Sequence, residues 1–315
     1  MTSGAGTVVV NTGSAFAGRL VGALAGLLPD EHVVGCRPGD PVPGDAEVLV
    51  TLLEDPDGIA DLLAPQVRWV HTLSAGVDGF PLSVAGDRVV TCSRGAASAA
   101  MAEWVLAAML AFEKDFPSSW VLSPPARWNV ATLGGLEGRT LGIVGIGAVG
   151  AEVARRALPF GMEVVGLRRT PGPASLGGVR IADSLPALLG DSHHVVLCAP
   201  ATPATARLID AAALATCRRG VHLVNVARGS LVDQDALLAA LDDGTVACAS
   251  LDVVEPEPLP HGHPFYSHPS VRLSPHVSWS GPSTGARTVE IFVDNLHRYR
   301  RGEPLYGVVD LGAGY

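Results

Sequence analysis

The chain has 315 residues, of which 48% are hydrophobic and 17% are charged, and its formal net charge is −9. Single hydrophobic cores stop growing near ~250–300 residues, so this length predicts two domains. The apolar content excludes a disordered or low-complexity chain. Acidic residues outnumber basic ones, 31 against 22, which argues against a nucleic-acid partner and against an anionic membrane surface.

Cysteine and lysine usage excludes further classes of protein. The five cysteines form no C-x-x-C pair, which argues against a disulfide framework and a structural zinc site. Lys114 is the only lysine, and no G-K-[ST] tripeptide is present, so a P-loop is excluded. The start of the chain has no signal pattern, and its longest apolar run, 104–112, is shorter than the ~20 residues of a membrane span. We therefore expect a cytoplasmic protein.

The first third of the chain alternates β-rich runs with helical runs. Four strands and one helix are predicted there: strands 7–11, 47–52, 68–73 and 89–92, and a helix near 15–27. A helix over 98–112 is apolar almost all round, which predicts burial between domains or subunits. The segment 117–138, rich in proline and glycine, follows it as a loop.

A second series of strands and helices begins at Thr140. Its predicted strands are 141–144, 163–167, 195–198, 222–226, 249–253 and 271–273, with helices over 148–158, 234–241 and 284–300. Such alternation is typical of parallel sheets with crossover helices. The sequence therefore predicts an α/β protein with two doubly wound domains in series.

The strand 141–144 runs into Gly145-Ile146-Gly147-Ala148-Val149-Gly150 and then a helix. This G-x-G-x-x-G in strand–turn–helix context indicates a dinucleotide-binding site. The first glycine permits the tight turn, the second lets a pyrophosphate approach, and the third lets helix and strand pack closely. The first helical residues, Ala148 and Val149, offer N–H groups to the phosphates.

The end of the next strand predicts which dinucleotide is preferred. An NAD site would place Asp or Glu there to bind the ribose hydroxyls. This chain has Arg168, Arg169 and Thr170 instead, and Glu163 lies too early in the strand. Guanidinium groups bind phosphate oxygens in a bidentate way, so the sequence predicts a preference for NADP(H), with NAD(H) still possible.

Several further motifs follow in a telling order. They are Ser74–Asp78 (SAGVD), Ala102-Glu103, Phe160–Met162, Pro200–Thr205, Val224–Asp233, Leu251–Pro258 and Ser274–Ser278. Together they make essentially the whole chain resemble the family of D-isomer-specific 2-hydroxyacid dehydrogenases. The resemblance implies a Rossmann cofactor domain, residues 97–280, inserted in a flavodoxin-like substrate domain, residues 1–96 and 281–315.

The resemblance also implies catalytic roles for Arg228, Glu257 and His276. Glu255 is the other candidate for the catalytic carboxylate. In the family this carboxylate directly precedes the second proline, here Pro258, which favours Glu257. The chemistry fits, because His exchanges protons near neutral pH, a carboxylate beside it favours the charged imidazolium, and Arg can bind the substrate carboxylate.

The remaining site residues are also implied by the resemblance. Substrate contacts are expected from Ser74, Ala75 and Gly76, from Arg228 and His276, and from Trp279, which could equally be packing. Further cofactor contacts are expected from Ala199, Pro200, Thr205, Val226, Ala227, Asp252 and Ser278. Arg94 could approach a substrate anion. His261, His263 and His268 have no acidic or cysteine partner at ligand spacing, so no metal site is expected.

The function implied is NADPH-preferring reduction of a small 2-oxo acid of the glyoxylate or hydroxypyruvate class to the D-2-hydroxy acid. A homodimer formed through the helix 98–112 and the following loop is also implied. Two alternatives stay open, a 3-phosphoglycerate dehydrogenase and a non-catalytic NAD(P)-sensing module on the same fold. The few basic residues of the first domain speak against the former, and the intact Arg228, Glu257 and His276 speak against the latter.

Overall fold

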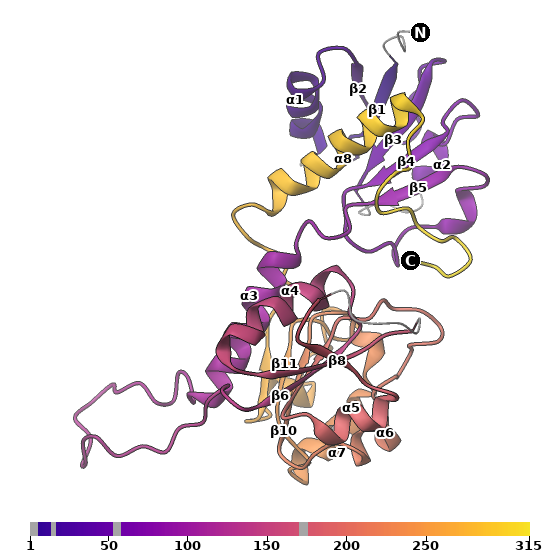
Figure 1. The fold of residues 1–315 in the computed structure, drawn as a ribbon. Helices are drawn as coiled ribbons and strands as arrows, with labels where there is room; N and C mark the ends of the chain where they lie inside the picture. Colours follow the sequence, from indigo (N-terminus) through magenta and orange to yellow (C-terminus); the bar gives the residue numbers. More distant parts are fainter. Residues whose placement is uncertain (1–5, 14–16, 53–57, 170–175) are drawn as a thin grey trace. The chain divides into compact units, whose positions relative to one another are not determined.

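The computed structural model describes residues 6–13, 17–52, 58–169 and 176–315 (Figure 1). The chain divides into two compact units. One, here called the split unit, comprises Met1–Ala97 and Gly281–Tyr315, and the other, the inserted unit, comprises Ser98–Ser280. Each contains one sheet of parallel strands flanked by helices, which confirms the predicted fold class of two doubly wound α/β domains.

The split unit has a five-stranded sheet in the order β2-β1-β3-β4-β5. Its strands are β1 (Thr7–Asn11), β2 (His32–Cys36), β3 (Ala46–Thr51), β4 (Trp69–Thr72) and β5 (Val89–Cys92). Its first helices are α1 (Ala17–Leu27) and α2 (Ile59–Leu62), with a 3₁₀ turn at Leu82–Val84. This strand order is that of flavodoxin-like sheets.

The last helix, α8 (Thr284–Arg301), completes the core of the split unit. Its buried Phe292 stacks on Trp69 of β4 with ring centroids 5.6 Å apart. Arg300 near its end binds the carboxylates of Glu31 and Glu47. The chain after α8 then adds an antiparallel bridge between Val308 and Thr91. The two ends of the sequence are therefore joined in one folded body.

The inserted unit has a seven-stranded sheet in the order β12-β11-β10-β9-β6-β7-β8. Its strands are β6 (Thr140–Val144), β7 (Glu163–Leu167), β8 (Val179–Ile181), β9 (His194–Leu197), β10 (Val221–Asn225), β11 (Val246–Leu251) and β12 (Val271–Leu273). Its helices are α3 (Ser98–Glu113), α4 (Ala148–Ala157), α5 (Leu185–Asp191), α6 (Ala211–Ala215) and α7 (Gln234–Asp242). Short 3₁₀ turns lie at Leu158–Phe160, Gly229–Leu231 and Pro264–Tyr266.

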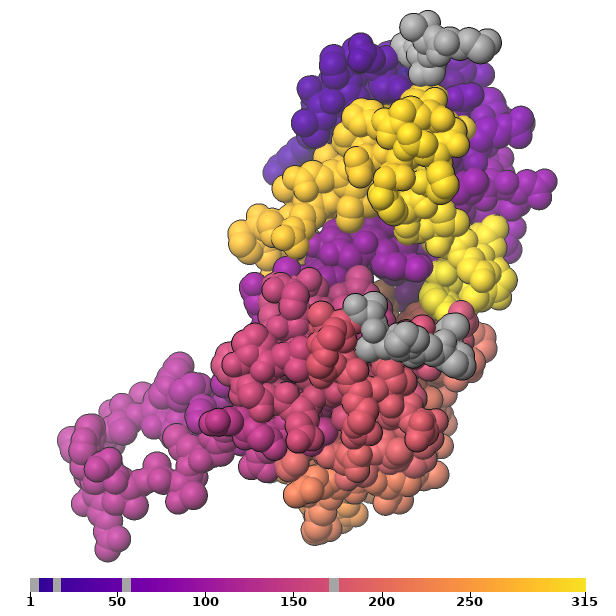
Figure 2. Space-filling model, viewed as in Figure 1, coloured from indigo at the N-terminus to yellow at the C-terminus, as the bar shows by residue number. Residues whose placement is uncertain are grey.

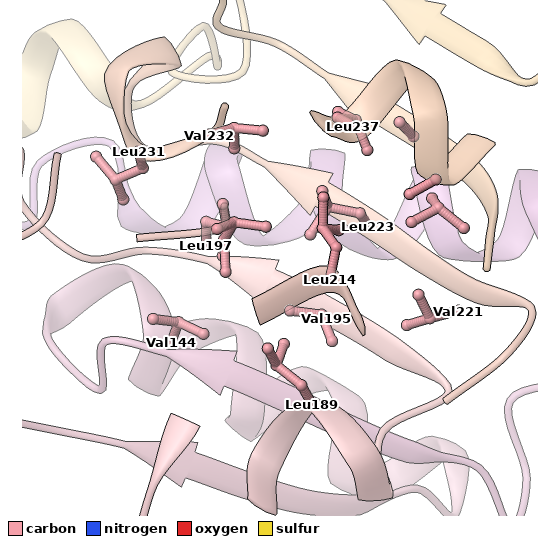
Figure 3. Packing of buried hydrophobic residues seen from close by; sticks show 14 of the residues in the cluster. Val144, Leu189, Val195, Leu197, Leu214, Val221, Leu223, Leu231, Val232 and Leu237 are labelled. Carbon is pink, nitrogen blue, oxygen red and sulfur yellow. The ribbon is translucent and has the colours of Figure 1, made fainter. Parts of the chain in front are cut away.

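Helices cover both faces of this sheet. Side chains of α3 and α4 pack on one face, against residues such as Ile143 and Val196. Those of α5, α6 and α7 pack on the other, where Figure 3 shows Leu189, Leu214 and Leu237 over the strands. Alternate residues of each strand point to opposite faces, so strands buried on both sides are almost wholly apolar. That composition made these strands recognisable in the sequence.

The strand order reverses between β6 and β9, because β7 and β8 lie on one side of β6 and β9 to β12 on the other. In open α/β sheets, ligands bind at such a reversal, beyond the carboxyl ends of the strands. The G-x-G-x-x-G segment follows β6 directly, so the fold places it at this point.

Several elements were absent from the predicted series. The edge strands β2 and β8 and the helix α2 were missed, and α5 and α6 were expected only as crossover helices between strands, without bounds. β2 is half-exposed and β8 has three residues, so neither gives a strong apolar run. α5 and α6 have seven and five residues, too few for a helical period, although Ser184 and Asp210 cap them by accepting main-chain N–H bonds. Glu103 and Ala107 of α3 are exposed in the inserted unit, and the burial of 98–112 between domains or subunits stays a prediction.

The described residues contain neither a membrane-spanning helix nor a cluster of metal-binding side chains. None of their helices combines the length and the apolar character that a membrane crossing requires. None of their His, Cys, Asp and Glu side chains gather in threes or more as a metal site would need.

Candidate active site

The predicted site segments of the inserted unit all follow strands of one parallel sheet. Gly145 follows β6, Arg168 follows β7, Ala199 lies two residues beyond β9, Val226 follows β10 and Asp252 follows β11. The segment 274–278 follows β12 in the same way. Carboxyl ends of parallel strands meet at one edge of a sheet, so the topology gathers these segments there.

The glycine motif has the tight geometry that its residues predict. Gly145 has φ = +101°, and a Cβ on it would lie 2.7 Å from the main-chain N of Ala199. A Cβ on Gly150 would lie 2.2 Å from the carbonyl oxygen of Gly145. A Cβ on Gly147 would meet nothing within 4 Å, and no side chain caps α4 at that residue. Open space therefore adjoins the uncapped N-terminus of α4, which suits a pyrophosphate.

The end of β7 carries guanidinium groups and no carboxylate. Arg168 is half-buried and Arg169 is exposed, directly after Leu167. Glu163 stands at the opposite end of the strand. Thr170, predicted together with them, lies outside the described residues.

Arg228 lies in a turn that a buried amide holds. The side chain of Asn225 accepts a bond from the N–H of Ala227 (3.0 Å) and donates to the carbonyl oxygen of Arg228 (2.9 Å). The guanidinium of Arg228 itself donates to the carbonyl oxygen of Ala227 (2.6 Å). The next residue, Gly229, packs so closely that a Cβ would lie 2.0 Å from the carbonyl carbon of Val254. The turn is therefore fixed against the segment that carries Glu257.

His276 and Glu257 form the central pair. Nδ1 of His276 lies 2.8 Å from Oε2 of Glu257, and both side chains are more than a third exposed. Oε1 of Glu257 accepts the N–H of Val254 (3.1 Å). A carboxylate only accepts hydrogen bonds, so Nδ1 is the donor, and Nε2 of His276 is left to exchange a proton. Glu255, the competing carboxylate, has no such pairing with His276 among the bonds of the described residues.

Asp252 holds the turn on which His276 lies. Its buried carboxylate accepts bonds from the N–H of Val277 (2.9 Å), the N–H of Ser278 (2.9 Å) and the hydroxyl of Ser274 (2.5 Å). Its carbonyl oxygen accepts the N–H of His276, whose φ is +54°. Left-handed backbone is costly for histidine, so these bonds maintain a strained conformation. A cofactor contact by Asp252 stays a prediction.

The other predicted cofactor residues lie at the same edge of the sheet. Val226 and Ala227 are buried in the turn after β10, and Ser278 is buried in the turn after β12. Pro200 and Thr205 close a loop after β9, because the hydroxyl of Thr205 donates to the carbonyl oxygen of Pro200 (2.7 Å). Ala199 supplies the main chain that meets Gly145.

The split unit holds the predicted segment 74–76 just after β4. Ser74 is anchored on both sides, since its hydroxyl bonds that of Thr72 (2.7 Å) and its carbonyl oxygen accepts the N–H of Ser93 (2.9 Å). Ala75 is exposed and Gly76 half-buried, and Arg94 is exposed after the neighbouring β5. These residues share the carboxyl edge of the split unit's own sheet.

Two hydrogen-bonding contacts near the site were not predicted: one is made by Trp279, expected as a pocket wall or a packing residue, and one by Gln234. Trp279 is half-exposed, and its indole N–H donates to the carbonyl oxygen of His276 (2.8 Å), so it braces the histidine turn. Gln234, the first residue of α7, bonds to the main chain of Glu255. It directly follows the predicted motif Val224–Asp233, and that adjacency was the available signal.

The chain is similar in sequence to a described protein family and to several curated proteins. A family model described as the NAD binding domain of D-isomer specific 2-hydroxyacid dehydrogenase matches residues 106–278. A glyoxylate reductase from Korarchaeum cryptofilum is 36% identical over 271 residues, which cover 82% of this chain and 81% of that enzyme. A D-3-phosphoglycerate dehydrogenase from Methanocaldococcus jannaschii is 29% identical over 79% of this chain but only 48% of its own length.

Two solved structures resemble nearly the whole chain. A D-isomer specific 2-hydroxyacid dehydrogenase from Xanthobacter autotrophicus Py2, in complex with NADPH and MES, has a TM-score of 0.86 and 32% identity, covering 99% of this chain and 100% of its own. An NADPH-dependent glyoxylate/hydroxypyruvate reductase from Sinorhizobium meliloti, in complex with NADP and sulfate, has a TM-score of 0.83 and 29% identity, covering 98% of this chain and 100% of its own.

Proposed function

This chain belongs to the family of D-isomer specific 2-hydroxyacid dehydrogenases, which are NAD(P)-dependent oxidoreductases, and we propose that it is an NADPH-preferring reductase of glyoxylate or hydroxypyruvate. The observation that carries the proposal is the pairing of Nδ1 of His276 with Oε2 of Glu257 (2.8 Å) at the sheet edge that also bears the glycine motif. The glyoxylate reductase and the NADPH-dependent reductase described above support the substrate class.

The reaction needs a hydride, a proton and an anchor for the substrate carboxylate. When bound, the nicotinamide supplies the hydride. His276 donates the proton from Nε2 to the substrate's carbonyl oxygen, because its Nδ1–H is engaged by Glu257. The negative charge of Glu257 stabilises the imidazolium before transfer. Arg228 binds the substrate carboxylate and polarises the carbonyl group.

The described residues fit a dinucleotide. The open space at Gly147 and the uncapped N-terminus of α4 would hold the pyrophosphate. Arg168 and Arg169 would hold a 2′-phosphate, since the strand end offers no carboxylate for free ribose hydroxyls. The two similar structures that hold NADPH or NADP support this preference. NAD(H) is proposed as the weaker cofactor.

The proposed substrate contacts of the split unit rest on the family resemblance. They comprise the main-chain N–H groups of Ser74, Ala75 and Gly76, which follow β4. A glycine at the third position permits close approach of a carboxylate to the backbone. Trp279 is proposed as a further wall of the substrate pocket.

We also propose that the protein acts as a homodimer. Residues 114–135, here called the arm, project from the rest of the inserted unit (Figures 1 and 2). Its exposed large apolar side chains are Phe116, Trp120, Val121, Leu122, Trp128, Val130 and Leu133. An exposed apolar surface of this kind marks an interaction site. The inserted unit also has a groove of about 450 Å³ with Leu106, Leu110 and Phe160 in its lining, which offers apolar surface to the arm of a second copy.

The experiment that tests the function is steady-state oxidation of NADPH and of NADH with glyoxylate, hydroxypyruvate, pyruvate and a bulky aromatic 2-oxo acid. We expect turnover with the small acids and a higher kcat/KM for NADPH. Turnover with NADH alone would support the proposed reaction but overturn the proposed preference for NADPH. Oxidation of 3-phosphoglycerate in place of this activity would favour the phosphoglycerate alternative, and NADPH binding without any turnover would favour the sensing module.

A further inference from the structure

Gln234 makes two hydrogen bonds with the main chain of one residue, Glu255, in the segment that carries Glu257. Its Nε2 donates to the carbonyl oxygen of Glu255 (2.6 Å), and its Oε1 accepts the N–H of Glu255 (3.1 Å). The amide thus pairs with the main chain on both sides of one residue, as a neighbouring strand would. Gln234 itself is fixed as the first residue of α7, which Asp233 caps by accepting the N–H of Ala236.

The segment held in this way places Glu257. Glu255, Pro256 and Glu257 are exposed, so little core packing fixes them. Glu257 is oriented by the N–H of Val254 on Oε1 and meets His276 through Oε2. The main chain at Val254 therefore sets where the carboxylate of Glu257 stands. Gly229, in the Arg228 turn, packs against the adjoining Val254–Glu255 peptide, and Gln234 bonds Glu255 from α7.

At neutral pH an amide side chain of this length can make both bonds, because its tip carries a donor and an acceptor side by side. Glutamine offers an N–H₂ donor and an oxygen acceptor, whereas an ionised glutamate only accepts and a leucine does neither. Asparagine has the same groups but is one methylene shorter. The position therefore requires the chemistry and the length of glutamine.

We propose that Gln234 is a positioning residue for the reaction, which holds Glu257 against His276 through the main chain of Glu255. This inference rests on the proposed function. Gln234 touches neither His276 nor Glu257 through a described side-chain bond, so it acts on them through the backbone. Small displacements of catalytic groups cost up to about a hundredfold in rate.

The kinetic test compares Gln234→Leu and Gln234→Glu with the unaltered enzyme. We expect Gln234→Leu to lower kcat by about ten- to a hundredfold, with the KM for NADPH unchanged. The matched control is Gln66→Leu, since the amide of Gln66 also donates to a main-chain carbonyl oxygen, that of Pro43 (2.7 Å), in the split unit. An equal loss in the control would overturn the proposal.

Gln234→Glu adds a test that a merely structural role would not pass. At neutral pH its carboxylate would face the carbonyl oxygen of Glu255 without a proton to donate. When protonated it has the donor and acceptor of glutamine. We therefore expect its kcat, relative to the unaltered enzyme at each pH, to rise as the pH falls toward 5. A ratio independent of pH would contradict the paired hydrogen bonds.

A double-mutant cycle shows whether Gln234 works through Glu257. In a Glu257→Gln background the pair with His276 is already weakened, so Gln234→Leu should lower kcat by less than threefold. Contacting residues of one network show such non-additivity, whereas independent sites add. An equal fold-loss of kcat in both backgrounds would overturn the proposed route.

Amide hydrogen exchange tests the positioning without any activity. The N–H of Val254 is protected by Glu257, so Gln234→Leu should speed its exchange at least tenfold, and Gln66→Leu should not. Unchanged exchange would refute the positioning role. If the unaltered enzyme turned over no 2-oxo acid while Val254 exchange still responded, the proposed function would fail and the positioning of Glu257 would stand.

Discussion

The Nδ1 atoms of His194 and His222 lie 3.2 Å apart in the buried core of the inserted unit. Nε2 of His194 lies 3.0 Å from Oε1 of Glu113, and Nε2 of His222 lies 3.0 Å from the hydroxyl of Ser250. Since a carboxylate only accepts, the protons of this chain are ordered. Ser250 donates to His222, His222 donates to His194, and His194 donates to Glu113. Burial lowers the pKa of both histidines well below neutral, so each is uncharged in this arrangement at pH 7.

Neutral buried histidines predict acid sensitivity. Burial lowers the pKa of His71 to about 3, and burial, together with Arg139 and His193, lowers that of His194 to about 3. The unfolded chain binds these protons near pH 6.5, whereas the folded chain does not. The contribution of the two histidines to the free energy of unfolding is therefore fully present above pH 6.5 and is lost as the pH falls toward 3. Each histidine should remove about 1.4 kcal/mol of unfolding free energy per pH unit in that window.

Urea unfolding at pH 7, 6 and 5 measures this loss. His71 lies in the split unit and bonds the hydroxyls of Thr91 and Ser93. His71→Gln retains hydrogen-bonding groups but cannot take up the proton. The free energy of unfolding of the split unit should therefore depend less steeply on pH in this variant. An unchanged slope would show that His71 does not contribute to the acid sensitivity.

The cofactor preference should depend on Arg168. Arg168→Asp replaces a phosphate-binding group by one that binds ribose hydroxyls and repels a 2′-phosphate. We expect the ratio of kcat/KM for NADPH to that for NADH to fall at least tenfold, which corresponds to about 1.4 kcal/mol. Arg155→Asp is the matched control, because Arg155 lies on α4 of the same unit and pairs with Glu152. If both variants changed the ratio equally, the change would be explained by a general effect of charge, and the proposed contact of Arg168 with the 2′-phosphate would be refuted.

The proton donor is tested by His276→Gln. Loss of a general acid lowers turnover by about a hundred- to ten-thousandfold. NADPH binding, followed by fluorescence titration, should change less than threefold. The control is His268→Gln, since the imidazole of His268 pairs with Asp242 away from the site. Turnover near that of the unaltered enzyme in His276→Gln would remove His276 from its proposed role.

The arm should be needed for self-association. Leu122 is 99% exposed and Trp128 is 75% exposed, so their replacement by serine costs the isolated chain little. We expect Leu122→Ser/Trp128→Ser to dissociate at protein concentrations at which the unaltered protein sediments as a dimer. Leu27→Ser, on α1 of the split unit, changes an apolar residue that is 56% exposed and should leave the mass unchanged. A monomeric unaltered protein would refute the proposal directly.

Strong local patterns explain what the sequence alone could predict. Apolar β-branched runs such as Val8–Val10 of β1 are buried on both faces, and the glycine motif is typical of the turn between a strand and a helix. Because strand ends in a parallel sheet meet, finding Arg228 and His276 after two strands was enough to predict that they share an edge.

The remainder depends on pairings that no local pattern encodes. His194 is hydrogen-bonded to Glu113, which lies 81 residues away in the sequence, and Gln234 to Glu255, which lies 21 residues away. β2, at a half-exposed sheet edge, mixes polar and apolar residues and lacks the run that reveals a central strand. Asp252 was identified from its motif, but its three donors come from a turn that only the fold brings to it.

Lys114, at the start of the arm, is a site for selective chemical labelling. Nζ of Lys114 donates to the carbonyl oxygen of Gly134 (2.6 Å) and so ties the two ends of the arm together. Since the sequence contains no second lysine, an amine-reactive dye can modify only this side chain and the α-amino group. Labelling at Lys114 thus places a spectroscopic reporter at a defined point of the arm in a protein without substitutions. Energy transfer between donor- and acceptor-labelled chains would then follow the pairing of two copies in real time.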